Sequence, residues 1–261
     1  IEMNPKLPEA YSNLGNIMKD MGNLKEAEIY SKKAIELNPY LLGAYSNLGN
    51  ILQDMGNLLD AEKYTRKAIE LDPNFFEAYS NLGSIFNDSG DLEKAELYIR
   101  KAIEINPRYA MAYYNLGNTL IQTGKIDDAE IFQRKAIEIE PNYEKPFYSL
   151  STLKDSYKNN DWQEKLFENS ILESKNKDQK IDVYFARANV SHQKKEFSES
   201  ASYLQLANEI KLSIFSSDMN KIIKKSNRLL SEFNSYHNKY SKSLESLENI
   251  FIVGMPRSGS T

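Results

Sequence analysis

A 34-residue period is the feature that most constrains how this chain of 261 residues can fold. It appears in one proline, two glycines and one alanine of each copy: Pro5, Pro39, Pro73, Pro107 and Pro141; Gly15, Gly49, Gly83 and Gly117; Gly22, Gly56, Gly90 and Gly124; Ala27, Ala61, Ala95 and Ala129. A period of this length is typical of solenoids, in which one supersecondary unit is copied and each copy packs on its neighbours. Because 41% of the residues are hydrophobic, stacked copies have enough apolar side chains for a continuous core.

Each period contains two stretches in which apolar residues recur at helical spacing. In the first copy they predict one helix near residues 8–21 and a second near residues 24–37. Gly22 lies where the first helix needs a left-handed terminator. Pro39 ends the second helix, because proline offers no backbone donor and forces the residue before it out of helical geometry.

The residues around these helix ends and crossings are also repeated. The expected N-caps of the second helices are Asn23, Asn57 and Asp91. Gly15 and Ala27 are small, so we expect the two helices of a repeat to approach closely at these positions. A single hairpin could not bury both of its faces, which is why the copies must stack.

The string Ala10-Tyr11-Ser12-Asn13-Leu14-Gly15, followed by Ala27, Ala34 and Pro39, resembles the tetratricopeptide repeat. The resemblance covers residues 5–141 as four complete copies. It implies an all-α fold, a right-handed superhelical solenoid of helix-turn-helix hairpins with a concave inner surface. The sequence departs from the family at one position. The family's aromatic residue usually stands four residues after the Ala27 position, but here it stands three residues after it, which could alter helix rotation. We expect these aromatics to serve in core or inter-repeat packing: Tyr30, Tyr64, Tyr98 and Phe132.

Beyond the regular repeats of residues 1–141, the period weakens. Residues 142–211 are interpreted as degenerate repeats, with one hairpin over 142–174 and another over 180–211. The polar run 173–178 is expected to be a loop between them. Trp162 is expected to cap the first of these hairpins rather than to bind a ligand.

The last part of the chain has a different character. Residues 212–248 are interpreted as a bridging helix or linker, and residues 249–261 as the start of an α/β domain. The apolar run 250–253 predicts a strand, and the Gly- and Ser-rich segment after it can cradle phosphate with backbone N–H groups. Ser260 stands where a nucleotide P-loop requires lysine, which disfavours an ATPase or GTPase. Arg257 can supply the cation instead.

The same twelve residues, 250–261, resemble the 5′-phosphosulfate loop of sulfotransferases that use 3′-phosphoadenosine 5′-phosphosulfate (PAPS). The resemblance extends to bacterial proteins in which tetratricopeptide repeats precede such a domain. It implies a set of residues that hold the cofactor's 5′-phosphate and sulfuryl group: Arg257, Ser258, Gly259, Ser260 and Thr261. The family's general base and acceptor pocket would lie beyond Thr261, so residues 1–261 alone should neither bind PAPS stably nor transfer a sulfuryl group. The alternatives are a stand-alone adaptor, with the terminal loop accidental, and an arm of a glycosyltransferase.

The first helices carry a row of asparagines that suggests a partner for the solenoid. Asparagines recur at two positions expected to face the concave side, with the serines Ser12, Ser46 and Ser80 expected beside them: Asn13, Asn47, Asn81 and Asn115; Asn16, Asn50 and Asn118. An amide both donates and accepts, so such a ladder can grip the backbone of an extended peptide. A comparable ladder is associated with peptide substrates in O-linked N-acetylglucosamine transferases, which the repeats resemble locally. The opposing interpretation is that each asparagine simply bonds to the neighbouring helix.

Several other functions are disfavoured. A carboxylate clamp for acidic peptide tails needs basic residues on the groove face, where serines and Tyr114 stand instead. Residues 1–141 hold 15 Lys and Arg against 22 Asp and Glu, so this half should repel nucleic acid. No apolar run could span a membrane. The chain lacks cysteine, and His192 and His237 have no ligand spacing, so no metal site is expected. A reducing, cytoplasmic setting is consistent with this composition.

Overall fold

The computed structural model describes residues 7–153, 161–173 and 175–214. The chain divides into two compact units, Ile1–Lys211 and Leu212–Thr261, and the architecture below is that of the first unit, with its last helix followed to Ile214. The expected bridging helix, the strand 250–253 and the phosphate loop fall outside the described residues.

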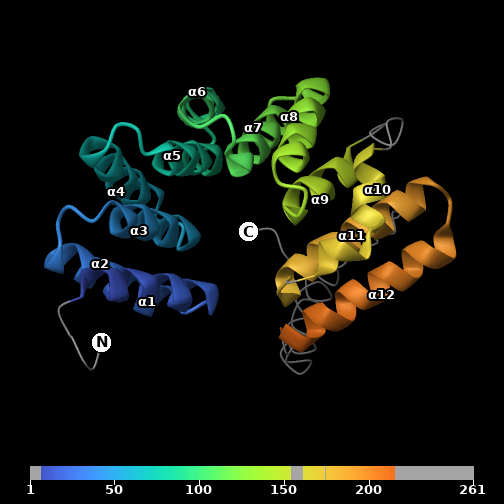
Figure 1. Ribbon diagram of the computed structural model, residues 1–261, viewed down its shortest axis with the longest axis horizontal. Coiled ribbons are helices and arrows are strands. Elements are labelled where there is room, and N and C mark those ends of the chain that lie inside the picture. The colour runs from blue at the N-terminus through green and yellow to red at the C-terminus, as the bar shows by residue number, and fades with distance from the viewer. Residues whose placement is uncertain (1–6, 154–160, 174, 215–261) are drawn as a thin grey trace, which may run out of the picture. The chain divides into compact units, whose positions relative to one another are not determined.

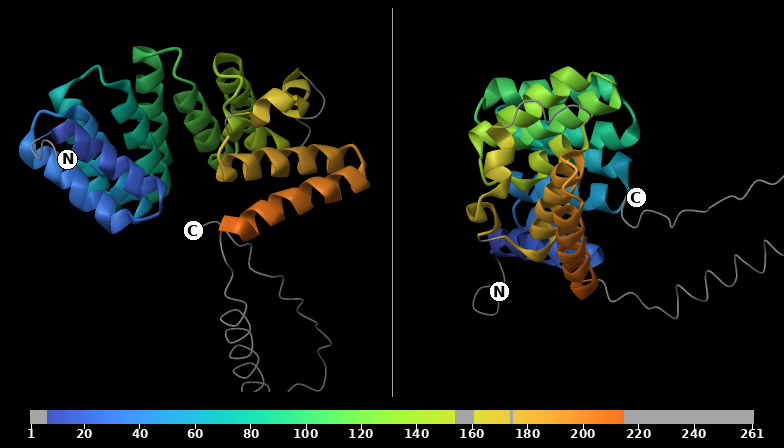
Figure 2. Two further views of the ribbon diagram at one scale, coloured as in Figure 1. Left: turned by 60° about the horizontal axis from the view of Figure 1, so that its bottom comes forward. Right: turned by 90° about the vertical axis from the view of Figure 1, so that its right-hand side faces the viewer.

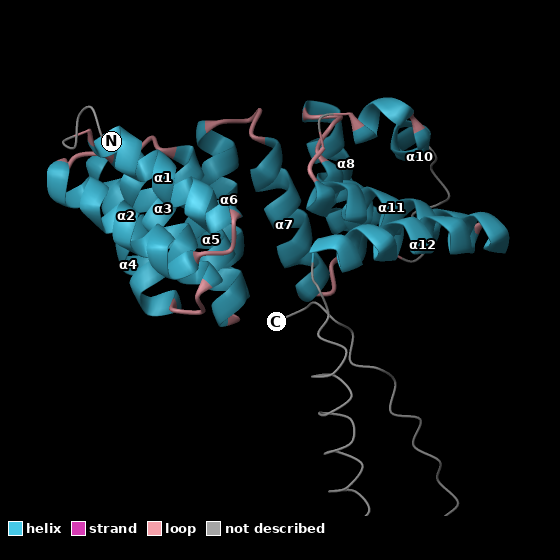
Figure 3. Ribbon diagram, turned by 90° about the horizontal axis from the view of Figure 1, so that it is seen from below, coloured by secondary structure: helices cyan, strands magenta, loops and turns pink. Residues whose placement is uncertain are grey.

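The described residues form α-helices joined by short turns (Figure 1), and no strand occurs among them (Figure 3). The helices are α1 (Pro8–Asp20), α2 (Leu24–Leu37), α3 (Leu42–Asp54), α4 (Leu58–Leu71), α5 (Phe76–Ser89), α6 (Leu92–Ile105), α7 (Ala110–Gln122), α8 (Ile126–Ile139), α9 (Glu144–Thr152), α10 (Asp161–Phe167), α11 (Lys177–Gln193) and α12 (Phe197–Ile214), with a 3₁₀ helix at Asn169–Leu172. The bounds of α1 and α2 agree with the two helices that the first period predicts.

Helices pack in sequence order, as in a solenoid. Each of the first four repeats is a hairpin, in which α1 packs on α2, α3 on α4, α5 on α6 and α7 on α8. The first helix of each repeat also contacts the first helix of the next, from α1 and α3 through to α9 and α11. These first helices therefore form a continuous row, on which the asparagines lie. The all-α solenoid predicted from the period is confirmed.

The turns within the repeats follow the local rules of helix termination. Gly22 has φ 77° and Gly90 has φ 82°, as predicted for left-handed terminators. The predicted N-cap residues stand at the N-cap positions, but only one of the three side chains makes the capping hydrogen bond. Asp91 accepts a hydrogen bond from the Lys94 backbone N–H, whereas the side chains of Asn23 and Asn57 accept no capping bond.

The repeated glycines of the first helices lie at the helix crossings. A Cβ added to Gly83 would lie 2.3 Å from Ile99 Cγ1 and 3.0 Å from the Ala95 carbonyl oxygen, both in the paired helix. Ala95 and its equivalents are fully buried. The close approach expected from these small residues is therefore present.

The aromatic series of the second helices packs on the tyrosines of the first helices. Within each regular repeat the two rings lie 6.3–6.4 Å apart between centroids: Tyr11 and Tyr30, Tyr45 and Tyr64, Tyr79 and Tyr98, Tyr113 and Phe132. These distances suit offset ring contacts. The series serves in packing, as the sequence predicts.

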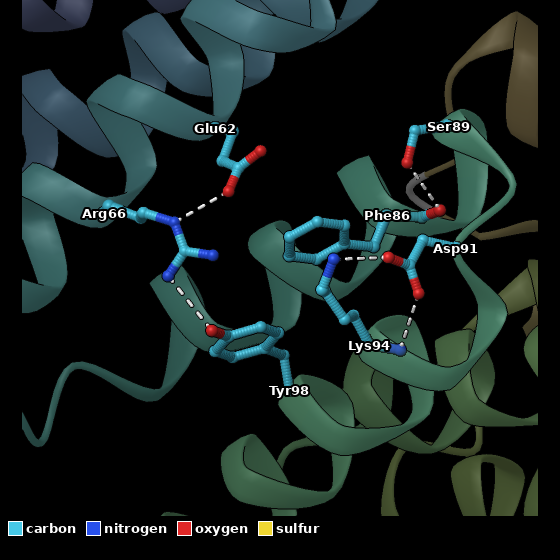
Figure 4. A network of polar contacts seen from close by, with 7 residues as sticks. All are labelled: Glu62, Arg66, Phe86, Ser89, Asp91, Lys94 and Tyr98. Carbon is cyan, nitrogen blue, oxygen red and sulfur yellow. Dashed lines mark hydrogen bonds and ion pairs between the residues drawn. The ribbon is translucent and has the colours of Figure 1, made fainter.

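A polar network joins the second helices of repeats two and three (Figure 4). Arg66 of α4 donates to Glu62 in its own helix, at 2.8 Å, and to the hydroxyl of Tyr98 in α6, at 3.0 Å. The Tyr98 ring stacks on Phe86 at 5.5 Å between centroids. One arginine thus links the second helices of two repeats.

The degenerate repeats differ from the regular ones in helix length. α9 has 9 residues against 13 or 14 in the preceding first helices, and its partner is the short α10. Trp162 of α10 is 2% exposed and packs with Phe147 in the core of this region, which agrees with its expected structural role. α11 and α12 form a long antiparallel hairpin (Figure 2).

The expected loop over residues 173–178 is shorter than predicted. α11 begins at Lys177, inside the polar run. Asn176 and Gln179 form a reciprocal capping box, in which each side chain accepts from the backbone N–H of the other. This pairing satisfies two otherwise unpaired donors and starts the helix early.

Candidate functional site

The asparagine ladder is built on pairs between successive first helices. Each asparagine Nδ2 donates to a serine Oγ of the preceding repeat, at 2.9–3.0 Å: Asn47 to Ser12, Asn81 to Ser46, and Asn115 to Ser80. The three serines are at most 6% exposed. The expectation that these serines face the groove is therefore wrong: they are buried because they accept the asparagine of the next repeat.

The donor side of the ladder thus bonds the neighbouring helix. The carbonyl oxygens differ, because Oδ1 of Asn47, Asn81 and Asn115 accepts no hydrogen bond within the described residues. These asparagines are partly exposed, and Asn13 is exposed. The amides of Asn47, Asn81 and Asn115 are each held by a buried serine while their carbonyl oxygens stay available. Binding of peptide by these oxygens stays a prediction.

The second asparagine row is less uniform. The side chains of Asn16 and Asn50 make no hydrogen bond to other described residues. In contrast, Oδ1 of Asn118 accepts from Gln133 Nε2 at 2.9 Å and from Ser149 Oγ at 3.3 Å. The carbonyl of Asn118 is therefore occupied internally.

The ladder changes character after the fourth repeat. Tyr114 replaces the buried serine, and its ring meets the Tyr143 ring edge-on at 5.5 Å between centroids. The pairing resumes between α9 and α11, where Asn189 Nδ2 donates to Ser151 Oγ at 3.0 Å. Sequence reasoning missed this rung, because Asn189 and Ser151 are 38 residues apart and the regular pairs are 35 apart.

Acidic residues accompany the ladder near the ends of the first helices. Asp88 Oδ2 accepts from Gln53 Nε2 of the preceding repeat at 2.6 Å. Burial raises the pKa of Asp54, Asp88 adds to this, and the ammonium groups of Lys19 and Lys145 oppose it. Lys145 of α9 therefore acts electrostatically on a carboxylate of α3.

A cavity of about 480 Å³ lies where α7, α9 and α11 begin. Its lining residues are Tyr109, Met111, Glu140, Tyr143, Glu144, Lys145, Lys175, Asn176, Asp178, Gln179 and Asp182. Nothing in the sequence pattern indicates this cavity, since its walls come from three separate segments, 109–111, 140–145 and 175–182. No repeated position marks it either.

A buried ion pair forms one wall of this cavity. Lys175 Nζ lies 2.8 Å from Glu144 Oε2, and the two side chains are 10% and 4% exposed. Lys175 Nζ also donates to the carbonyl oxygen of Asn142. These contacts join the start of α9 to the segment that precedes α11.

Two other polar groups in the cavity wall have no hydrogen-bond partner among the described residues. The side chain of Asp182 forms no hydrogen bond or ion pair within the described residues, and burial beside Glu144 raises its pKa to about 6, against the opposing effect of Lys145. Burial also raises the pKa of Tyr143, whose hydroxyl has no partner in the part of the chain that the structure describes.

Metal and membrane sites find no support in the described part of the chain. It holds no group of three or more potential metal ligands. The His192 ring meets Phe197 edge-on at 5.4 Å. Every helix there is too short or too polar to cross a bilayer.

Family models decide what the array is. Three models described as tetratricopeptide repeats match residues 8–40, 43–75 and 74–141, together about half of the chain. The chain is a tetratricopeptide repeat protein. Its array is a scaffold suited to binding a protein or peptide.

Solved structures support this fold for the tetratricopeptide array. PilF of Pseudomonas aeruginosa aligns with a TM-score of 0.57 at 19% identity, over 84% of this chain and 97% of PilF. TTC0263, a tetratricopeptide protein of Thermus thermophilus, aligns with a TM-score of 0.55 at 17% identity, over 77% of this chain and 98% of its own. No curated protein sequence matches the chain. At such identities the likeness concerns the fold alone.

Proposed function

We propose that the array binds an extended peptide segment of another protein along Asn13, Asn47, Asn81 and Asn115. The observation that carries this proposal is the serine–asparagine pairing. Three amides are each held by a buried serine, and their carbonyl oxygens have no partner among the described residues. A fixed row of acceptors can take backbone N–H groups from a peptide with little regard for its side chains.

Holding the amides in place favours binding. An asparagine that is free to rotate loses rotamer entropy when it binds, whereas one already bonded to a buried serine loses less. Each added hydrogen bond contributes about 0.5–1.5 kcal/mol net. Three rungs together could therefore change a peptide affinity by roughly ten- to a thousandfold.

The ladder is tested with the triple variant Asn47→Ala, Asn81→Ala and Asn115→Ala. On an array of random 15-residue peptides, we expect the variant to lose most of the binding of the original chain, by tenfold or more. The loss follows from removing three carbonyl acceptors at once. Peptide binding is read as fluorescence of the labelled protein on each spot.

The matched control for the ladder removes the serines and keeps the asparagines. The variant Ser12→Ala, Ser46→Ala and Ser80→Ala loses the same inter-repeat hydrogen bonds and retains the carbonyl oxygens. It should keep more of the peptide binding than the triple asparagine variant does, and lose only the part that comes from holding the amides in place. If both triple variants lose binding equally, the ladder acts only through packing between repeats, and the proposal fails.

We further propose that the array is the recruiting arm of a PAPS-dependent sulfotransferase. This proposal is supported by the sequence of residues 250–261, where a predicted strand is followed by Pro256, Arg257, Ser258 and Gly259. The guanidinium of Arg257 would hold phosphate or sulfate oxygens, and the loop would stabilise charge on the phosphosulfate during transfer. PAPS itself would supply the sulfuryl group.

A PAPS titration of a protein that joins this chain to the residues following Thr261 tests the second proposal. We expect calorimetry to detect PAPS binding and Arg257→Ala to weaken it by about tenfold or more. Arg108→Ala, at an exposed arginine of the repeats, should leave it unchanged. Absence of PAPS binding would leave the stand-alone adaptor or the glycosyltransferase arm. Residues 1–261 by themselves should show no sulfuryl transfer.

A further inference from the structure

The cavity at the start of α7, α9 and α11 carries an excess of negative charge. Its lining includes Glu140, Glu144, Asp178 and Asp182 against two lysines. Because Glu144 and Lys175 form a buried pair, they neutralise each other. The remaining three carboxylates then face the single ammonium of Lys145.

Two carboxylates, one in the wall and one outside it, lack partners among the described residues, and a cation would stabilise both. The carboxylate of Asp182 has no hydrogen bond or ion pair within the described residues, and burial raises its pKa. Outside the lining, Oε2 of Glu77 is buried without a partner among the described residues. Burial raises the pKa of Tyr109, which lines the cavity, and the negative charge of Glu77 adds to this rise. A buried carboxylate without a partner is unfavourable unless a positive charge comes near.

Two tyrosines give the cavity aromatic walls. Tyr109 and Tyr143 both line it, and both are partly buried. Aromatic faces attract ammonium and, more often, guanidinium groups. The volume of about 480 Å³ lies within the range of small-ligand sites, so a long side chain can enter.

The cavity adjoins the ladder on the same helix faces. Met111 lines the cavity one helical turn before Asn115 on α7, and Asp182 lines it two turns before Asn189 on α11. The cavity therefore lies beside the interval between these two rungs. A side chain of a peptide held by the ladder could reach it.

We propose that this cavity binds the cationic head of a lysine or arginine side chain of the peptide that the ladder holds. The proposal rests on the proposed function and specifies its partner as a basic segment. The ring faces of the two tyrosines contact the cationic head. The carboxylates of Asp182, Asp178 and Glu140 supply the opposite charge.

The cavity is tested without any peptide, by titrating ¹⁵N-labelled protein with butylguanidinium and, in parallel, with the neutral analogue butylurea. We expect the cation to shift the amide signals of residues 143–145 and 176–182, and butylurea to leave them nearly unchanged. Asp182→Asn and Asp178→Asn should each weaken the cation about fivefold. Asp182→Asn removes a carboxylate that has no partner among the described residues, so this variant should fold.

Two controls separate the possible causes. Asp128→Asn removes one charge from an exposed position on α8 and should leave the titration unchanged. The triple asparagine variant of the ladder should bind butylguanidinium as the original chain does, so loss of peptide binding and loss of cation binding are distinguishable. Equal shifts with butylurea, or equal weakening by Asp128→Asn, would overturn the cavity as a cation site.

Discussion

Lys175→Met is expected to lower the free energy of unfolding by about 3–5 kcal/mol. The substitution leaves the Glu144 carboxylate, 4% exposed, without its ion-pair partner and removes the donor to the Asn142 carbonyl oxygen. A single buried charge without a partner is much less favourable than the intact pair or than no charge at all. Urea unfolding followed by circular dichroism measures the change.

Two further variants establish that burial of the charge is the cause. Lys180→Met, five residues further along in α11, removes an equal charge from a side chain with no ion pair among the described residues, and should change stability by less than about 0.5 kcal/mol. Combining Lys175→Met with Glu144→Gln should recover part of the loss, because the buried group is then neutral. A loss of the same size in both lysine variants would contradict the argument.

Gly83→Ala is expected to destabilise the protein by about 3 kcal/mol. The added methyl would lie 2.3 Å from Ile99 Cγ1 and 3.0 Å from the Ala95 carbonyl oxygen. Ile99 is fully buried and branched at Cβ, so its side chain cannot move to another rotamer. The Ala95 carbonyl oxygen can move away only if the two helices separate. Thermal unfolding should show a lower midpoint.

The matched control is the same substitution at a glycine in open space. Gly43 lies in the first turn of α3, and a Cβ there would meet no atom within 4 Å. Gly43→Ala should stabilise the protein by up to about 0.5–1 kcal/mol, since alanine loses less backbone entropy in a helix. The two substitutions therefore have opposite expected signs. A stable Gly83→Ala protein would mean that the helices do not cross as closely as described.

Most of the regular array was predictable because its rules are local. Hydrophobic spacing, a left-handed glycine and a proline after each second helix depend on residues within one hairpin. The same local rules were less successful at the capping positions. Asn57 occupies the N-cap position, but its side-chain amide donates to Asp60 at 2.9 Å instead of accepting a backbone N–H.

The candidate site was predictable only in part. The asparagine ladder is visible in the period, but the burial of Ser12, Ser46 and Ser80 is not, since it depends on how one first helix is rotated against the next. A residue's exposure on a helix surface is decided by the neighbour packed on it. Sequence periodicity specifies which residues share one face of a helix. The helix packed against that face decides which of these residues remain exposed to solvent.

By itself, the sequence determined the kind of unit, its length and its number of regular copies, because these follow from short-range spacing of helix formers and breakers. Only the tertiary structure revealed that a cavity exists at the start of α7, α9 and α11 and which residues line it. Its buried pair joins Glu144 to Lys175, 31 residues further along the chain, in repeats whose period has decayed. Contacts between repeats depend on packing angles and side-chain volumes, which no local pattern records.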